Sequence, residues 1–145
     1  MRSFLMLLLL YACASSGTNT VPTTPEQGAR LPRVKRLYLG DLGQDHGSAI
    51  VREKIRARLM ASQRFDIVEE RQRADAVLTG AAGLMRHGAR HYRGLGIFRI
   101  VENRTGETIW SYEYKRGLMF GGSVSSRMAD QVVGQLLQVA GPIRS

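Results

Sequence analysis

The sequence predicts an α+β fold in two layers, with a mixed sheet of four to five strands and two helices on one face, in the order β-α-β-β-β-β-α. Two segments repeat apolar residues every four positions, which is the period of an amphipathic helix. The segments between them alternate apolar and polar residues, as half-buried strands do. Residues 33–140 carry all of these segments and are long enough to bury the core of a single domain.

The first predicted strand is "VKRLYLGDL", in which Leu37 and Leu39 share one face. The loop after it, "GDLGQDHGS", contains Asp41, Asp45 and His46. It lacks the Gly-Lys-Ser/Thr of a phosphate-binding loop and the alternating ligands of a calcium loop. We therefore expect a solvent-exposed connection.

The first predicted helix begins at Ser48, whose hydroxyl is expected to cap it. Val51, Ile55 and Leu59 repeat at four-residue steps and mark its buried face. Charged residues occupy the other face. We expect a solvated helix surface there, and docking of an anionic partner is the alternative.

Two strands are expected after this helix. "RFDIVEE" is short and alternating, with Phe65 and Ile67 on one side. "ADAVLTGAAGLMRH" is longer, and its small residues from Gly80 to Gly83 leave room for a helix or another backbone to approach closely.

A hairpin is predicted in "HYRGLGIFRIVENRTGETIWSYEYK", with its turn at residues 103–106. Trp110, Tyr112 and Tyr114 alternate on one face of its returning strand. Such a row is most simply core or half-buried surface. If it is exposed, it forms a platform for a protein partner or a glycan, so the three aromatic residues are candidate binding residues.

A basic turn, "RHGARHYR", joins the long strand to this hairpin. Its candidate anion-binding residues are Arg86, His87, Arg90, His91 and Arg93. A solvated tip is the simplest interpretation, and contact with lipid phosphate or a wall polymer is the alternative. We expect no metal here, because the two histidines do not lie on a helix with a third ligand.

The last predicted helix begins near Ser123. Its apolar residues recur at four-residue steps and are Val124, Met128, Val132 and Leu136. We expect it to pack on the sheet beside the first helix, and residues 141–145 to form a C-terminal tail.

The N-terminus has the pattern of a signal peptide. Arg2 supplies a positive charge, and nine apolar residues follow from Phe4 to Ala12, about half of the ~20 residues that span a bilayer. Residues 1–12 are therefore expected to be a targeting segment and not a transmembrane anchor.

Two cleavage reactions compete at the end of this segment. "LYAC" looks like a bacterial lipobox, in which Cys13 is lipidated and becomes the new N-terminus, although Tyr11 departs from the usual small or aliphatic residue. Alternatively, "ACA" is a small-x-small site, and cleavage after Ala14 discards the cysteine. We favour lipidation of Cys13, followed by a disordered tether over residues 13–32 that is rich in Ser, Thr, Gly and Pro.

Several short motifs within the domain form a pattern found in exported bacterial domains. They are Leu59, Ser62 and Phe65, then Ile67, Val68 and Glu69, then "ADAVLTG" from Ala74 to Gly80. The pattern, over residues 33–140, resembles the α+β domain of the curli-secretion lipoprotein family, of the lipoprotein activators of penicillin-binding proteins, and of the N-terminal part of the Tol-system propeller protein.

The resemblance implies a scaffold rather than an enzyme, because such domains serve in assembly, docking or activation. It also implies that Asp75 is structural and fixes the turn into its strand. The chain lacks the extra length with which curli-secretion proteins build a pore, so we expect no pore.

The composition is basic, with 21 Lys and Arg against 12 Asp and Glu and a net charge of +9. Such a charge favours anionic partners, which in a cell envelope are lipid phosphates or acidic glycans. The leader makes nucleic acid an unexpected partner. Residues 14–145 contain no cysteine, which excludes disulfides and cysteine metal sites from them.

The sequence contains few residues arranged as in known catalytic motifs. The chain has no Gly-x-Ser-x-Gly elbow and no His-Glu-x-x-His sequence, and Gly94 and Gly96 lack the third glycine and the helix of a dinucleotide fingerprint. We therefore expect no enzyme and no cofactor.

The sequence thus predicts a lipoprotein on the periplasmic face of the outer membrane, because Ala14 is not the aspartate that retains enteric-type lipoproteins at the inner membrane. Its expected function is non-catalytic docking to, or assembly of, an envelope complex. Binding of an anionic ligand is the second hypothesis, and a hydrolase of unrecognised type is the third.

Overall fold

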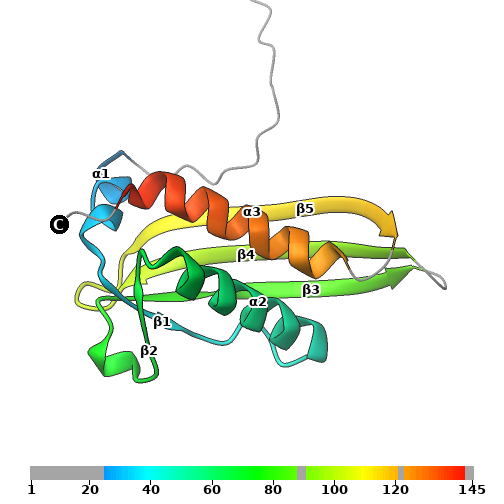
Figure 1. Ribbon diagram of the computed structural model, residues 1–145, viewed down its shortest axis with the longest axis horizontal. Coiled ribbons are helices and arrows are strands. Elements are labelled where there is room, and N and C mark those ends of the chain that lie inside the picture. The colour runs from blue at the N-terminus through cyan, green and yellow to red at the C-terminus, as the bar shows by residue number, and fades with distance from the viewer. Residues whose placement is uncertain (1–24, 88–90, 121–122, 143–145) are drawn as a thin grey trace, which may run out of the picture.

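The computed structural model describes residues 25–87, 91–120 and 123–142, and it confirms the predicted α+β fold. The elements in chain order are α1 (Pro25–Gly28), η1 (Leu31–Arg33), β1 (Arg36–Leu39), α2 (His46–Ser62), β2 (Asp66–Val68), η2 (Arg71–Arg73), β3 (Ala76–His87), β4 (His91–Glu102), β5 (Thr108–Phe120) and α3 (Ser123–Ala140). The five strands form one sheet in the order β2-β1-β3-β4-β5. The helices α2 and α3 lie side by side across one face of it (Figure 1).

The sheet has a parallel and an antiparallel part. β1 pairs in parallel with both β2 and β3, so that Leu37 lies opposite Ile67 and Ala76. β3, β4 and β5 are antiparallel to one another, and Phe98 of β4 lies opposite Gly80 of β3. The parallel pair β1–β2 requires a crossover connection, which α2 provides, whereas turns suffice for the antiparallel strands.

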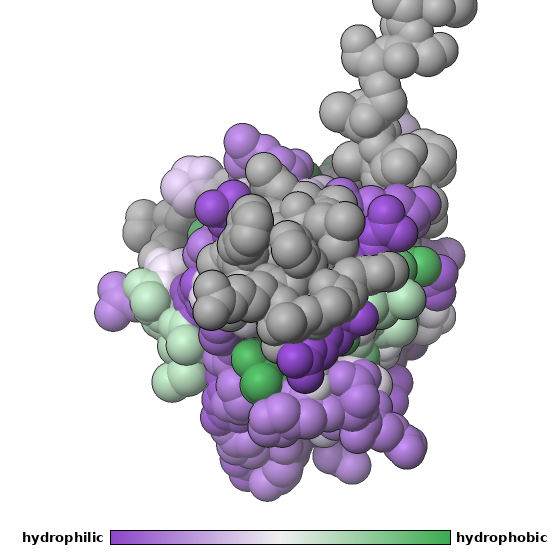
Figure 2. Space-filling view, turned by 90° about the vertical axis from the view of Figure 1, so that its right-hand side faces the viewer, coloured by the Kyte–Doolittle hydropathy of each residue, from purple (hydrophilic) through white to green (hydrophobic). Residues whose placement is uncertain are grey.

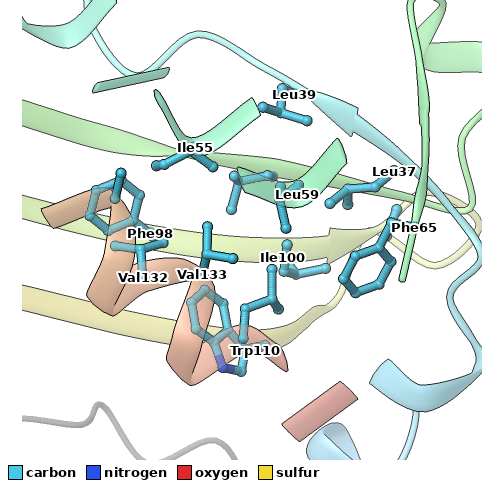
Figure 3. Packing of buried hydrophobic residues seen from close by; sticks show 14 of the residues in the cluster. Leu37, Leu39, Ile55, Leu59, Phe65, Phe98, Ile100, Trp110, Val132 and Val133 are labelled. Carbon is cyan, nitrogen blue, oxygen red and sulfur yellow. The ribbon is translucent and has the colours of Figure 1, made fainter. Parts of the chain in front are cut away.

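The core lies between the sheet and the two helices. The predicted stripe of α2 is fully buried at Val51, Ile55 and Leu59, and the stripe of α3 is buried as well. Figure 3 shows Trp110 of β5 lying close to Val133 of α3. Each aliphatic side chain buried in this way stabilises the fold by roughly 1.5–3 kcal/mol, so the helices hold the sheet through these stripes.

The charged face of α2 is not only a solvated surface, as the sequence had suggested. The Arg52 guanidinium donates to the carbonyl oxygens of Leu39 (2.8 Å) and Gly40 (3.1 Å), at the end of β1. The Lys54 ammonium donates to the hydroxyls of Ser125 (2.7 Å) and Ser126 (2.8 Å) of α3. These basic residues therefore connect α2 to its neighbours.

The cap of α2 differs from the prediction. The helix begins at His46, and Asp45 is the N-cap, because its carboxylate accepts the Ser48 backbone N–H at 3.0 Å. Ser48 is instead buried, and its hydroxyl lies within hydrogen-bond distance of the Asp45 carboxylate and of the Ala82 carbonyl oxygen, 2.6 Å away. The hydroxyl and backbone N–H of Ser48 hold the pKa of Asp45 below its ordinary value.

The predicted tether is too long at its C-terminal end. Residues 25–28 form a helical turn, and Leu31 is completely buried in the core cluster. The Arg64 guanidinium donates to the carbonyl oxygens of Pro32 (2.9 Å) and Val34 (3.0 Å), which fastens this segment to the domain. The sequence predicted disorder for residues 25–32 because Leu31 is the one large apolar residue in the segment. A single such residue forms no helical or strand pattern.

Candidate functional site

The aromatic row of β5 belongs to the core. Trp110 and Tyr114 are 3% and 1% exposed, and Tyr112 is half-buried against the same cluster. The rings of Trp110 and Tyr112 are stacked, with centroids 6.1 Å apart, and the Tyr112 hydroxyl donates to Gln131 of α3 at 3.4 Å. The three residues face the helices, so the hypothesis of an exposed aromatic platform is wrong.

The basic tip stands at the end of the β3–β4 hairpin, as predicted. Arg86 pairs in register with Tyr92, and Met85 pairs with Arg93. Since directly opposite residues share a face and successive residues alternate, exposed Arg86 and exposed Arg93 lie on opposite faces of the hairpin. Arg90 and the side chains of His87 and His91 lie outside the part that the structure describes. Binding of an anion at this tip stays a prediction.

The predicted anchor also lies outside the described residues. This applies to the signal peptide of residues 1–12, to Cys13 and to the tether up to residue 24. Within the described ranges, none of the helices has both the length and the apolar character to cross a bilayer.

A different surface stands out, on the face of the sheet opposite the helices. Met85 of β3 and Leu95 and Ile97 of β4 are 49%, 37% and 40% exposed there. Small residues lie between them, because Ala81 pairs with Ile97 and Gly83 pairs with Leu95. We call this surface the open face, and it comprises Ala81, Gly83, Met85, Leu95, Ile97, Glu113 and Lys115.

The open face is slightly hollowed. A shallow depression of about 390 Å³ lies over β3, β4 and β5, and its walls are largely apolar. Glu113 and Lys115 of β5 border it and form an ion pair at 2.6 Å. Exposed Arg93 and Arg99 lie on the same face of β4. Apolar side chains surrounded by charged ones are typical of the surfaces with which proteins bind one another.

The end view of the molecule agrees with this mixed character. In Figure 2, hydrophilic residues cover most of the coloured surface at the hairpin end, and hydrophobic residues emerge between them in separate places. On the coloured part of this surface, the hydrophobic residues therefore form limited patches.

The sequence contained a signal for the open face that the aromatic row obscured. In "RGLGIFRI", glycines occupy the inward positions 94 and 96, while Leu95 and Ile97 occupy the outward ones. A Cβ at Gly94 would lie 2.8 Å from side-chain atoms of Val124 and Met128, so α3 leaves no room for a larger inward residue. Large outward and small inward residues are the reverse of an ordinary half-buried strand.

Asp75 has a structural environment. Its carboxylate accepts the backbone N–H groups of Lys35 (3.1 Å) and Arg36 (2.8 Å) and the Arg36 guanidinium (2.9 Å). Burial alone would raise the pKa of Asp75, but these donors together hold it below its ordinary value. Asp75 therefore ties the start of β3 to β1, the place that the family resemblance implied for it.

Other chemistry is sparse in the described part of the chain. No group of three or more His, Cys, Asp or Glu side chains is placed there to hold a metal ion. A second depression lies beside Asp75 and the β4–β5 turn, where the Arg36 backbone N–H donates to Asp75 and Arg30 pairs with Glu102.

Neither a protein-family model nor a curated protein sequence matches this chain. Among solved structures, a variant of PelC from Paraburkholderia phytofirmans, described as a dodecamer, is similar with a TM-score of 0.54, 17% identity, and coverage of 73% of this chain and 86% of that one. A protein from Caulobacter crescentus described as a lipoprotein is similar with a TM-score of 0.51, 12% identity, and coverage of 81% and 98%. The resemblance to exported bacterial lipoproteins is therefore confirmed at the level of the fold.

Proposed function

We propose that this protein is a lipid-anchored, non-catalytic component of the bacterial cell envelope that docks to a protein complex through its open face. Three exposed apolar side chains, Met85, Leu95 and Ile97, on a helix-free sheet face carry the proposal. A fold shared with a solved bacterial lipoprotein supports the envelope location, and the lipobox supports the anchor at Cys13. Attachment at the periplasmic face of the outer membrane follows from Ala14.

The open face is a better candidate than the basic tip. The tip's two described arginines, Arg86 and Arg93, lie on opposite faces of the hairpin, so they cannot together contact one small anion. Leu95 and Ile97 lie two positions apart on the same face of β4, and Met85 of β3 lies diagonally across from Leu95. Burying such side chains in an interface gains about 25 cal/mol for each Å² of apolar surface removed from water.

Replacement of Cys13 with serine tests the anchor. We expect the wild-type chain to occur in the membrane fraction with an intact mass that corresponds to an acylated N-terminal Cys13. The Cys13→Ser variant should lack the acyl mass and leave the membrane fraction, because a lipid supplies the attachment. A soluble wild-type chain that begins at Ser15 would contradict the anchor.

Replacement of Ile97 with aspartate tests the docking. We expect the Ile97→Asp variant to lose at least about tenfold in recovery of its partner from crosslinked cells, because removing a carboxylate from water in an apolar contact costs well over the 1.4 kcal/mol that a tenfold change represents. The matched control is Met60→Asp, at an exposed apolar residue of α2 on the other side of the molecule.

Photocrosslinking at the same two positions locates the contact directly. A crosslinker at position 97 should capture a defined protein, and one at position 60 should not. Equal adducts at both positions, or equal loss of the partner in both aspartate variants, would refute docking through the open face. The thermal unfolding of both variants should stay close to that of the wild type, because both side chains are exposed.

A further inference from the structure

The sheet ends in one long and accessible strand. Its order places β2 at one edge and β5 at the other, and β2 spans only Asp66–Val68 whereas β5 spans Thr108–Phe120. Among the residues that the structure describes, β5 pairs with β4 along one side only. The outer side of such a strand presents backbone N–H and C=O groups that can pair with another chain.

The shielding that proteins commonly give to edge strands is weak along most of β5. The strand contains no proline, but its pairing with β4 is irregular at two places, between Thr108 and Trp110 near its start and between Arg116 and Met119 near its end. α1 lies against the first part of β5, as Figure 1 shows at the end of the molecule where the strand begins. Residues 111–116 lie between the two irregularities, and we take them as the part of the edge that can accept a strand.

The charges of β5 are arranged so that the strand is complementary to itself. In an antiparallel pair of β5 strands with a two-fold axis at Tyr114, Glu113 of one copy lies directly opposite Lys115 of the other, and the same contact occurs twice. Directly opposite residues have Cβ atoms about 4.5–5.5 Å apart, close enough for an ion pair. Glu113 and Lys115 already pair within one strand at 2.6 Å, so the four charges would alternate in sign on the open face.

Neighbouring registers are disfavoured by the same charges. An axis at Glu113 would place the two Glu113 carboxylates opposite each other, and an axis at Lys115 would do the same with two ammonium groups. Like charges that lie directly opposite are destabilising. An axis between two residues is excluded because it would pair an open-face position with a helix-face position.

We propose that two copies of this chain pair through their β5 edges, antiparallel about a two-fold axis at Tyr114, to form one continuous sheet. A second copy is the occupant that the charges select, because a two-fold interface uses the same patch on both subunits. The pairing places the two open faces next to each other. It does not depend on the proposed docking, which uses the apolar side chains of β3 and β4, although Glu113 and Lys115 border both surfaces.

Charge reversal on the full chain in mild detergent tests the pairing by sedimentation equilibrium. We expect the wild type to show a concentration-dependent equilibrium between monomer and dimer. Lys115→Glu and Glu113→Lys should each weaken the dimer at least about tenfold, because each places like charges opposite each other. The double variant Glu113→Lys/Lys115→Glu should recover most of the affinity, since it exchanges the two charges and keeps their pairing.

The matched control is Arg99→Glu, which changes the net charge as much as Lys115→Glu but lies on β4, away from the edge. It should dimerise as the wild type does. A wild type that remains monomeric at all concentrations, or one that forms only larger rings, would overturn the proposal. So would single variants that dimerise normally, or a double variant no better than the singles.

Discussion

Replacement of Gly80 with alanine is expected to destabilise the protein by about 4 kcal/mol or more, a large share of the roughly 5–15 kcal/mol by which a domain is stable. Gly80 has a φ of +150°, in a region that essentially only glycine adopts. A Cβ built there would lie 1.9 Å from the Ile97 carbonyl oxygen of β4. Alanine at this position therefore requires the β3–β4 pair to separate, because a backbone atom cannot rotate out of the way.

The matched control is Gly83→Ala, three residues along the same strand. No heavy atom lies within 4 Å of a Cβ at Gly83, and its φ is ordinary. We expect this variant to change the free energy of unfolding by less than about 1 kcal/mol, with a small gain from the lower backbone entropy of alanine in the unfolded chain. Urea unfolding of both variants measures the difference, and similar values for the two would refute the close approach at Gly80.

Replacement of Arg64 with alanine is expected to lower the free energy of unfolding by about 3 kcal/mol. Hydrogen bonds from a charged donor contribute about 1.5–3 kcal/mol each, but water can bond to some of the carbonyl oxygens that the guanidinium leaves. The guanidinium donates to four backbone carbonyl oxygens, those of Pro32, Val34, Ala140 and Gly141, at 2.9–3.0 Å. It thereby joins the N-terminal segment to the C-terminal end of α3. Its charge also suits the negative end of that helix.

The surroundings of Arg64 explain why few other residues can replace it. Burial lowers the pKa of its guanidinium, whose carbon lies 4.8 Å from the centre of the Phe65 ring. Arg64→Lys should recover less than half of the lost free energy of unfolding. A single ammonium group cannot reach all four carbonyl oxygens, which lie around the edge of the planar guanidinium.

The control for Arg64 is Arg99→Ala, at an exposed arginine of β4 on the side of the sheet away from the helices. It should change the free energy of unfolding by less than about 0.5 kcal/mol, as surface substitutions usually do. Chemical denaturation measures all three variants. A loss below about 1 kcal/mol for Arg64→Ala would mean that water satisfies these carbonyl oxygens equally well.

Much of the fold was predictable because its signals are local. The four-residue repeats of α2 and α3 and the alternation of Leu37 and Leu39 depend only on which residues a regular backbone places on one side. The β4–β5 turn was also predictable, since Gly106 has the positive φ of +72° that glycine favours. The N-cap was placed at the wrong residue because Asp45 and Ser48 are both good capping residues, and their order depends on the path of the loop.

The candidate surface was less predictable. The sequence alone determined that Trp110, Tyr112 and Tyr114 share one face of β5, because side chains alternate along any strand. It did not determine that this face lies under α3, since aromatic side chains suit a core and an exposed platform equally. The alternation also places Leu95 and Ile97 on one face of β4 and Gly94 and Gly96 on the other. It does not determine which of these two faces is buried.

Only the tertiary structure decided these questions, because a strand's period of two defines two faces and the neighbouring layer selects one of them. α3 passes so close to β4 that a Cβ at position 94 would require Val124 and Met128 to shift, and the alternation of the strand then places Leu95 and Ile97 outward. The contacts of Arg64 are likewise invisible in the sequence, since they join residues thirty or more positions apart on either side. The sequence by itself thus determined where the helices and strands lie and which residues of a strand share a face. The packing of α3 on the sheet decided which face of the sheet stays exposed.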